Sequence, residues 1–169
     1  PEKFVWISNV DTVSSRSNKR RIPRIVHQTT KSRCVTKKVA KAAERWNFEW
    51  YEYYLHDDEA VMRLLTAEFP EFPHLELIAR RCLIHGTVKA DLWRYLVLWK
   101  YGGIYADIDS VPAKFDAETS IDSSDDAFFV VEQYHLLSQW FMAATPRHPL
   151  MYYAIQHSLA SLLMASDTG

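Results

Sequence analysis

The sequence predicts an α/β domain in which strands and helices alternate along most of its 169 residues. Short runs rich in β-branched and aromatic residues alternate with segments whose apolar residues recur at helical spacing. The chain holds only four glycines, which is typical of a helix-rich fold rather than a β-sandwich with many tight turns. A chain of this length fits one domain with a substantial hydrophobic core.

The N-terminal segment, residues 1–21, is expected to be an arm or linker that precedes the main domain at residues 22–169. The apolar run at 4–7 predicts a short strand or a packed arm. Residues 11–21 are rich in Ser, Lys and Arg, which is typical of a loop. We interpret the basic run Lys19–Arg21 as a solvated lead-in rather than a binding patch.

The first core strand is expected at Ile22–Gln28, with Pro23 near its start, where a missing backbone donor is tolerated. His27 and Gln28 then lie near the carboxyl end of this strand, where ligands of open α/β sheets gather. Both are therefore candidate binding residues. His27 fits a buried structural histidine equally well, so both interpretations stay open.

A helix with a basic outer face is expected at Thr36–Trp46, with Thr36 as its N-cap, and a second strand at Trp50–Leu55. The acidic cluster that follows, His56–Glu59, suggests a metal site at first sight. Capping of the next helix by Asp57 or Asp58 is the simpler interpretation. That helix is expected at Ala60–Phe69, with Glu59 and Glu68 exposed and Pro70 and Pro73 ending it.

A helix or irregular segment at Leu75–Leu83 precedes the most informative part of the chain. Apolar residues at Val88, Leu92, Leu96 and Trp99 predict an amphipathic helix, on which Asp91 and Arg94 stand three apart and share one face. Gly102 and Gly103 follow, where a helix needs a left-handed cap.

Two carboxylates follow the short apolar strand expected at Ile104–Ala106. In an extended segment, Asp107 and Asp109 face the same side, so their charges repel and favour a bound cation. Oxygen ligands suit Mg²⁺ or Mn²⁺, which commonly bind through one or two carboxylates plus substrate phosphates. Each motif alone is weak, but together with Arg94 they predict a site that holds a divalent cation and a diphosphate, as in a sugar nucleotide.

The rest of the chain continues the alternation. Val111 and Pro112 leave the sheet, residues 120–126 form a polar loop, and Phe128–Glu132 predicts a further strand. A C-terminal helix is expected from Pro149 onward.

Composition bounds the function further. The net charge of −1 indicates no basic field, so nucleic acid is not an expected partner. Cys34 and Cys82 form a disulfide or remain buried thiols, and the spacing does not decide between these. No apolar run reaches the roughly 20 residues that a membrane span needs.

The sequence resembles the family 32 glycosyltransferases, which carry an Asp-x-Asp motif. The match rests on three segments and a fainter fourth: Ile22–Thr29, Ala90–Tyr95, Tyr101–Asp109, and Phe141–Leu150. The spacing of the acids and Arg94 is also similar to that in the glucosylating clostridial toxins. The resemblance implies a GT-A nucleotide-diphospho-sugar transferase fold, a mixed sheet flanked by helices.

By this resemblance, Asp91 and Arg94 would contact the donor sugar and diphosphate as catalytic residues. Tyr105 and Asp107 would contact the nucleoside, and Asp109 would be the main ligand of Mn²⁺ or Mg²⁺, with Asp107 assisting. His27 and Gln28 complete the expected donor-binding set. The resemblance also implies a retaining enzyme of the Golgi or secretory lumen, with a membrane anchor in the full-length form.

Two departures from the family pattern bear on these expectations. An Asn expected shortly before the fourth segment is absent, and the nearest amides are Gln133 and Gln139. A late His- or Trp-containing segment that contacts metal and phosphate is also absent, so we expect a C-terminally truncated catalytic domain.

The favoured function is transfer of a hexose from GDP-mannose to a glycan or lipid, with UDP-sugars open as donors. An inactive sugar-nucleotide-binding domain of the same fold is the alternative. A metal-dependent phosphohydrolase is a third hypothesis, which would need further acids or histidines beside Asp107 and Asp109.

Overall fold

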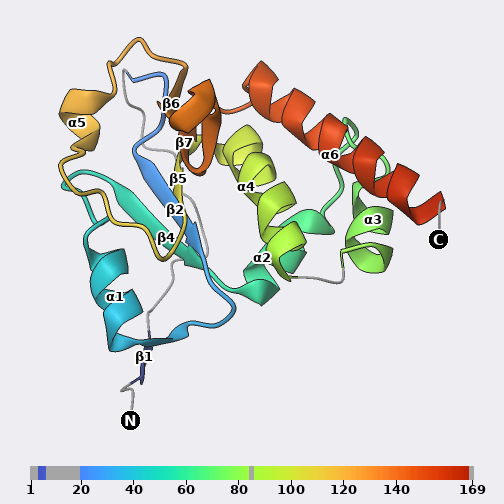
Figure 1. The fold of residues 1–169 in the computed structure, drawn as a ribbon, viewed down its shortest axis with the longest axis horizontal. Coiled ribbons are helices and arrows are strands. Elements are labelled where there is room, and N and C mark those ends of the chain that lie inside the picture. Colours follow the sequence, from blue (N-terminus) through green and yellow to red (C-terminus); the bar gives the residue numbers. More distant parts are fainter. Residues whose placement is uncertain (1–3, 7–19, 84–85, 168–169) are drawn as a thin grey trace.

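The computed structural model describes residues 4–6, 20–83 and 86–167, and it confirms the predicted α/β class (Figure 1). Its centre is a five-stranded mixed sheet with the order β4-β2-β5-β7-β6. The strands of this sheet are β2 (Ile25–Thr29), β4 (Glu52–His56), β5 (Gly103–Ala106), β6 (Ala127–Val131) and β7 (Leu137–Ala144).

Strands β4, β2 and β5 are parallel, whereas β7 and β6 are antiparallel to their neighbours. The chain passes from β2 to β4 on one side and later returns to β5 on the other, so β2 marks a topological switch point. Ligands of open α/β sheets bind at such points, beyond the carboxyl ends of the strands. The fold therefore brings the ends of β2 and β5 together where a site is expected.

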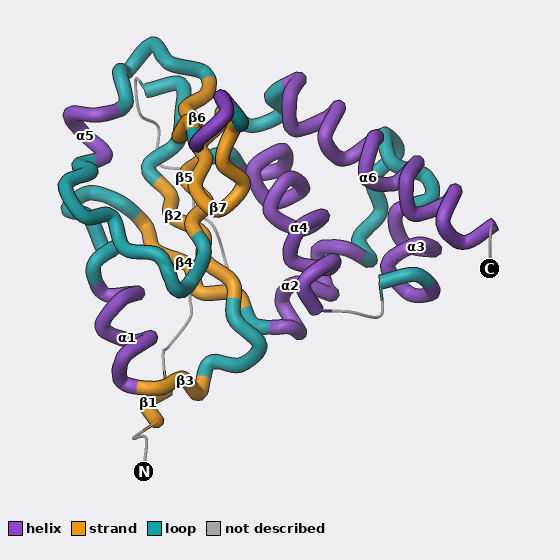
Figure 2. Tube along the Cα trace, viewed as in Figure 1, coloured by secondary structure: helices purple, strands orange, loops and turns teal. Residues whose placement is uncertain are grey.

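Helices cover both faces of the sheet. Figures 1 and 2 show α4 and α6 on one side and α1 and α5 on the other. The helices are α1 (Lys37–Glu44), α2 (Asp58–Leu65), α3 (Leu75–Arg81), α4 (Gly86–Tyr101), α5 (Ala117–Ser120) and α6 (Pro149–Asp167). A 3₁₀ turn, η1 (Gln133–His135), joins β6 to β7.

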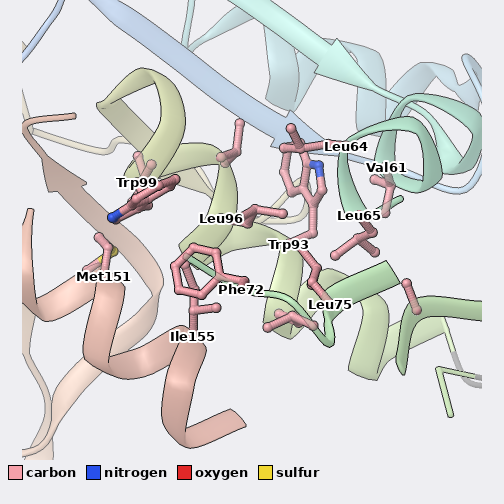
Figure 3. Close-up of a cluster of buried hydrophobic side chains, with 14 of the residues drawn as sticks. Val61, Leu64, Leu65, Phe72, Leu75, Trp93, Leu96, Trp99, Met151 and Ile155 are labelled. Atoms are coloured by element: carbon pink, nitrogen blue, oxygen red, sulfur yellow. The ribbon is translucent and has the colours of Figure 1, made fainter. Parts of the chain in front are cut away.

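Two hydrophobic cores lie on the two faces of the sheet. The larger packs α2, α3, α4 and α6 together, with Trp93 and Leu96 of α4 fully buried at its centre (Figure 3). Alternation along β5 sends Tyr105 into this core and Ile104 and Ala106 into the second one, around Trp46. Burial on both faces explains why β5 is an uninterrupted apolar run.

The ends of the helices confirm the predicted caps. Thr36 accepts a hydrogen bond from the Val39 N–H at the start of α1, and Asp57 accepts one from the Ala60 N–H at the start of α2. Asp57 therefore caps a helix, and Asp58 and Glu59 lie in its first turn. Gly102 ends α4 with φ of 67°, the left-handed conformation that glycine adopts readily.

Several predicted boundaries were wrong. Trp50 is exposed in a turn with φ of 69°, so β4 begins only at Glu52. Helix α2 ends at Leu65, before Pro70, because Thr66 closes its last turn by donating to the Met62 carbonyl. Glu68 therefore lies beyond the helix.

Strand β2 begins at Ile25 rather than Ile22, since a tight turn places the Ile25 N–H on the Pro23 carbonyl. Strand β7 was not predicted at all. In the segment at 75–83, the helical alternative is confirmed as α3.

The N-terminal run forms β1 (Phe4–Trp6), which pairs with β3 (Cys34–Thr36) in a separate two-stranded sheet. Most of the loop expected at 11–21 lies outside the described residues, and the domain boundary at 21/22 stays a prediction. Cys34 and Cys82 are both free thiols. In the part of the chain that the structure covers, no helix has the length and hydrophobicity to cross a bilayer.

Candidate active site

Helix α4 presents the first two predicted site residues. Asp91 and Arg94 lie on one face, and the Arg94 Nη2 is 2.9 Å from the Asp91 Oδ1. The Asp91 side chain is 53% exposed, whereas that of Arg94 is only 10% exposed. Arg94 is thus a desolvated cation whose orientation the surrounding protein fixes, and Asp91 lies at the open edge.

Arg94 links α4 to the sheet. Its Nη2 lies 3.5 Å from Oδ1 of Asp107, and its Nη1 donates to the Gln139 carbonyl at 3.2 Å. The guanidinium also lies over the Tyr105 ring, 5.1 Å from its centroid. Its buried Nε has no hydrogen-bond partner among the described residues.

The Asp107 carboxylate is held from two directions at the end of β5. Tyr105 donates its hydroxyl to Oδ1 at 2.6 Å, and Arg94 approaches the same oxygen. Burial raises the pKa of Asp107, whereas the Tyr105 hydrogen bond and the Arg94 charge lower it. The negative charge of Asp109 raises the pKa of Asp107 further, which means that the two acids are electrostatically coupled.

The Asp107 main chain is fixed as firmly as its side chain. Its carbonyl accepts hydrogen bonds from Gln28 Nε2 at 3.0 Å, the Ser110 N–H at 3.0 Å and Ser110 Oγ at 2.6 Å. Its N–H donates to the Trp140 carbonyl at 2.8 Å. These contacts come from β2, β7 and the following turn, so they orient the peptide from several sides.

Asp109 is placed differently from the prediction. The extended segment ends at Ala106, and residues 108–109 form a turn closed by the hydrogen bond from Ser110 to the Asp107 carbonyl. Strand alternation therefore does not relate Asp107 to Asp109. A turn relates them, and it leaves Asp109 exposed.

A cation at this position would need ligands beyond those that the described residues gather here. Within the described ranges, no group of three or more His, Cys, Asp or Glu residues is arranged to hold a metal. Asp107 and Asp109 offer two carboxylates, and Oδ1 of Asp107 is already engaged. This donor set fits Mg²⁺ or Mn²⁺, which take few protein carboxylates and complete their shells with phosphate oxygens and water. It gives no support to the phosphohydrolase hypothesis, which needs additional acids or histidines.

Three predicted donor contacts lie behind the site rather than at its surface. His27 and Gln28 are completely buried, and Tyr105 is also buried, with its hydroxyl on the Asp107 carboxylate. In this structure none of the three presents an exposed surface, and their direct contact with a sugar nucleotide stays a prediction. Gln28 and Tyr105 hold the main chain and the carboxylate of Asp107.

The surroundings of His27 are those of a buried structural histidine. Its Nε2 lies 3.1 Å from the Gly102 carbonyl, and its Nδ1 lies 3.2 Å from Nε2 of His56. Burial lowers the pKa of His27 from 6.5 to about 4. It also lowers the pKa of His56, and the charge of His27 adds to that effect. The pair is therefore neutral in the folded protein at neutral pH.

This burial predicts a loss of stability in acid. The unfolded chain protonates His27 below pH 6.5, whereas the folded chain does so only near pH 4, because the pKa of the buried ring is lowered. The contribution of His27 to the free energy of unfolding is therefore fully present above pH 6.5 and is lost as the pH falls from 6.5 to 4. Between pH 7 and 4.5, His27 is expected to contribute a loss of roughly 2–3 kcal/mol in the free energy of unfolding. Urea unfolding at both pH values checks this.

The matched comparison is between His27→Gln and His157→Gln, which replaces an exposed histidine of α6. The His27→Gln variant should lose markedly less stability on acidification, and His157→Gln should behave like wild type. An equal pH dependence in all three proteins would contradict the assignment.

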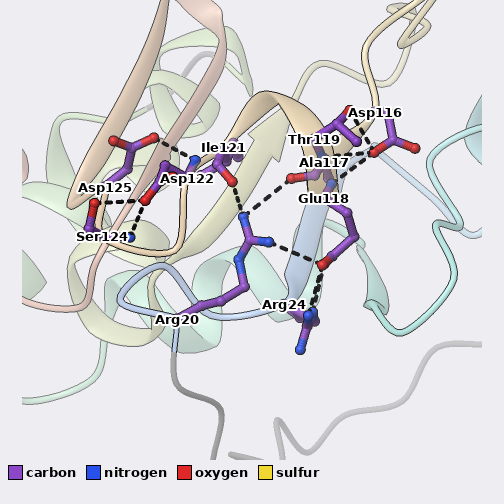
Figure 4. A network of polar contacts seen from close by, with 10 residues as sticks. All are labelled: Arg20, Arg24, Asp116, Ala117, Glu118, Thr119, Ile121, Asp122, Ser124 and Asp125. Carbon is purple, nitrogen blue, oxygen red and sulfur yellow. Dashed lines mark hydrogen bonds and ion pairs between the residues drawn. The ribbon is translucent and has the colours of Figure 1, made fainter.

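The loop that begins at Asp107 is anchored to the start of β2 (Figure 4). Arg24 donates to both carboxylate oxygens of Glu118, at 2.7 and 2.8 Å, and Arg20 donates to the same residue at 3.1 Å. Arg20 also donates to the carbonyl of Ile121, and Asp116 caps α5. Helix α5 is thereby held against the sheet.

This network corrects the interpretation of the basic run at 19–21. Lys19 lies outside the described residues. The Arg20 side chain is only 9% exposed and ion-paired, so it is not a solvated lead-in. Arg21 is exposed and lies 3.5 Å from Asp126.

Other groups that shape the site were missed. Gln139 and Trp140 act through backbone carbonyls, and no side-chain pattern could have indicated them. Tyr53 contacts Gln28, and its place at the centre of an expected strand was the only available signal.

The mixed sheet, its flanking helices and the acids beyond β5 are consistent with the class of GT-A-like α/β glycosyltransferase domains. Comparison with known families gives the assignment within that class. The chain belongs to the family described as "glycosyltransferase sugar-binding region containing DXD motif", whose model matches residues 16–125.

Curated relatives from Schizosaccharomyces pombe agree with this assignment. The chain is 25% identical to inositol phosphoceramide mannosyltransferase 1 over 155 residues, which cover 89% of the chain and 46% of the relative. It is 34% identical to inositol phosphoceramide mannosyltransferase 3 over 90 residues, 52% of the chain and 24% of the relative. It is 28% identical to initiation-specific alpha-1,6-mannosyltransferase over 152 residues, 78% of the chain and 38% of the relative.

The chain thus spans less than half the length of each of these relatives. No solved structure gives a significant match.

Proposed function

We propose that the protein is a metal-dependent, retaining glycosyltransferase that moves a hexose from a sugar nucleotide, with GDP-mannose as the preferred donor. The observation that carries this proposal is the position of Arg94, desolvated between Asp91 and Asp107 at the carboxyl edge of the sheet. Membership in the family with the Asp-x-Asp motif supports the reaction class, and the relatives named as mannosyltransferases support the sugar.

Each site residue has a distinct task in this proposal. Asp107 and Asp109 hold Mn²⁺ or Mg²⁺, which when bound neutralises charge on the leaving diphosphate. Arg94 donates to phosphate or sugar oxygens through its planar guanidinium. Asp91, at the open edge, accepts hydrogen bonds from sugar hydroxyls and orients the anomeric carbon. Tyr105 and Gln28 keep Asp107 in place.

The proposed transfer proceeds by attack from the face that the diphosphate leaves. An acceptor hydroxyl oxygen forms the bond to the anomeric carbon as the bond to the diphosphate oxygen breaks. The hydroxyl proton passes to the departing diphosphate. This route retains the anomeric configuration and needs no nucleophile from the protein.

The acceptor is proposed to be a hydroxyl of a glycan or a lipid. One relative is named for transfer to inositol phosphoceramide, and another is named as an initiation-specific alpha-1,6-mannosyltransferase. We place the reaction in the lumen of the Golgi or secretory pathway, with the full-length protein held at the membrane.

The alternative is a sugar-nucleotide-binding domain without turnover. In that case Arg94 and the two carboxylates hold the donor and the cation, and no sugar is transferred. Binding without product formation would distinguish it from the transferase.

Donor consumption tests the proposal. The protein is incubated with Mn²⁺ and, separately, GDP-mannose, UDP-glucose, UDP-galactose and UDP-GlcNAc, and the released nucleoside diphosphate is quantified. We expect GDP release to exceed UDP release from every other donor. Preferred consumption of a UDP-sugar would correct the donor, and binding with no consumption would favour the inactive domain.

A further inference from the structure

We propose that Tyr53 is a positioning residue for the donor site, which acts through Gln28 on the main chain of Asp107. The inference rests on the proposed function, because it assigns to Asp107 the binding of the cation and donor. It adds a residue from β4, the edge strand, that has no contact of its own with the acids.

The contacts run across three adjacent parallel strands. Tyr53 of β4 donates its hydroxyl to Gln28 Oε1 at 2.8 Å, and Gln28 of β2 donates through Nε2 to the Asp107 carbonyl at 3.0 Å, just beyond β5. Gln28 is completely buried. Burial also raises the pKa of Tyr53, so its hydroxyl keeps its proton and remains a donor.

The Gln28 amide is held in one orientation from both of its ends. A glutamine amide has an acceptor end and a donor end of nearly equal size. The Asp107 carbonyl can only accept, so it requires the NH₂ end, and the Tyr53 hydroxyl donates to the oxygen that then faces β4. A reversed amide would bring two oxygens together at the distance where the structure has a hydrogen bond.

The orientation matters because the Asp107 carbonyl is also the acceptor that closes the turn to Ser110. That turn carries Asp109. Loss of the Gln28 contact would let the peptide rotate and would change the spacing between the two carboxylates. Substitution of a residue that orients a metal ligand in this indirect way typically lowers metal affinity or activity by about 10- to 100-fold.

Tyr53→Phe tests the inference, with Tyr54→Phe as its matched control. The control removes a hydroxyl from the next residue of the same strand, where Tyr54 donates to Glu52 at 2.6 Å rather than to Gln28. Calorimetry measures GDP-mannose binding across a Mn²⁺ titration, and thermal unfolding measures stability. We expect the Mn²⁺-dependent affinity to fall about tenfold or more in Tyr53→Phe and to stay within about twofold of wild type in Tyr54→Phe.

The outcomes separate the two levels of the proposal. Wild-type binding that Tyr53→Phe leaves unchanged would overturn the positioning role alone. Absence of binding by the wild type would overturn the proposed function and the inference with it. If Tyr53→Phe does not fold, Gln28→Met breaks the same link by removing the donor, and it is expected to weaken binding equally.

Discussion

Replacing Gly103 with alanine is expected to destabilise the protein by roughly 3 kcal/mol or more, with a matching fall in the thermal midpoint. Gly103 has φ of 99°, a conformation that strains any residue with a β-carbon. A methyl group there would also lie 2.6 Å from the Ile25 carbonyl oxygen and 3.0 Å from its Cβ. Because β2 and β5 are adjacent strands, only a shift between them could relieve this contact.

Gly86→Ala is the matched control for Gly103→Ala. Gly86 begins α4 without a positive φ, and a β-carbon added there would meet no other described atom within 4 Å. Because alanine has the higher helix propensity, this variant should be neutral or slightly more stable. Equal stability of the two variants in chemical denaturation would contradict the close approach of β2 and β5.

The sequence was sufficient to predict the part of the site that depends on local periodicity. Helical spacing places Asp91 and Arg94 on one face, and the two glycines specify where α4 ends. The strand after them is short and buried on both sides, which accounts for its apolar character. These features depend on neighbours in the sequence, so a pattern of a few residues reveals them.

The parts that depend on pairing between distant segments were not predictable. Strand β7 contributes the Gln139 and Trp140 carbonyls. Every residue type has a backbone carbonyl, so the sequence does not indicate which carbonyls shape the site. The turn at Asp109 is closed by Ser110, whose hydroxyl donates to the Asp107 carbonyl. The same pattern that suggested an extended pair is equally compatible with that turn.

For the buried polar residues, the sequence could not distinguish ligand contact from structural support. His27, Gln28 and Tyr105 stand at the carboxyl ends of central strands, where ligand contacts are common. The same position also suits residues that support the site from below, and only burial distinguishes the two roles. The burial of all three and the contacts of Gln28 and Tyr105 with Asp107 favour the supporting role, which sequence position alone could not indicate.

The second large effect is expected for Asp109→Asn, which should weaken Mn²⁺-dependent donor binding by about 100-fold or more. The substitution keeps the size of the side chain and removes its charge. Since Asp109 is exposed in a turn, the folded structure has little need of that charge. Stability should therefore change by less than about 0.5 kcal/mol, as for surface substitutions in general. An effect on binding without an effect on stability is the signature of a ligand-binding carboxylate.

Asp116→Asn is the control within the same loop. Asp116 caps α5 by accepting from the N–H groups of Glu118 and Thr119, and asparagine retains the accepting oxygen. The substitution Asp116→Asn removes the same negative charge as Asp109→Asn, seven positions further along the chain. Binding by this variant should match wild type, which excludes a general effect of net charge on a negatively charged donor.

The most direct measurement is calorimetric titration of GDP-mannose into the wild type, Asp109→Asn and Asp116→Asn, each with and without Mn²⁺. We predict binding that requires Mn²⁺ in the wild type and in Asp116→Asn and that is lost in a folded Asp109→Asn. Binding by Asp109→Asn as tight as that of the wild type, or binding that is indifferent to Mn²⁺, would contradict a cation-linked donor site at Asp107 and Asp109.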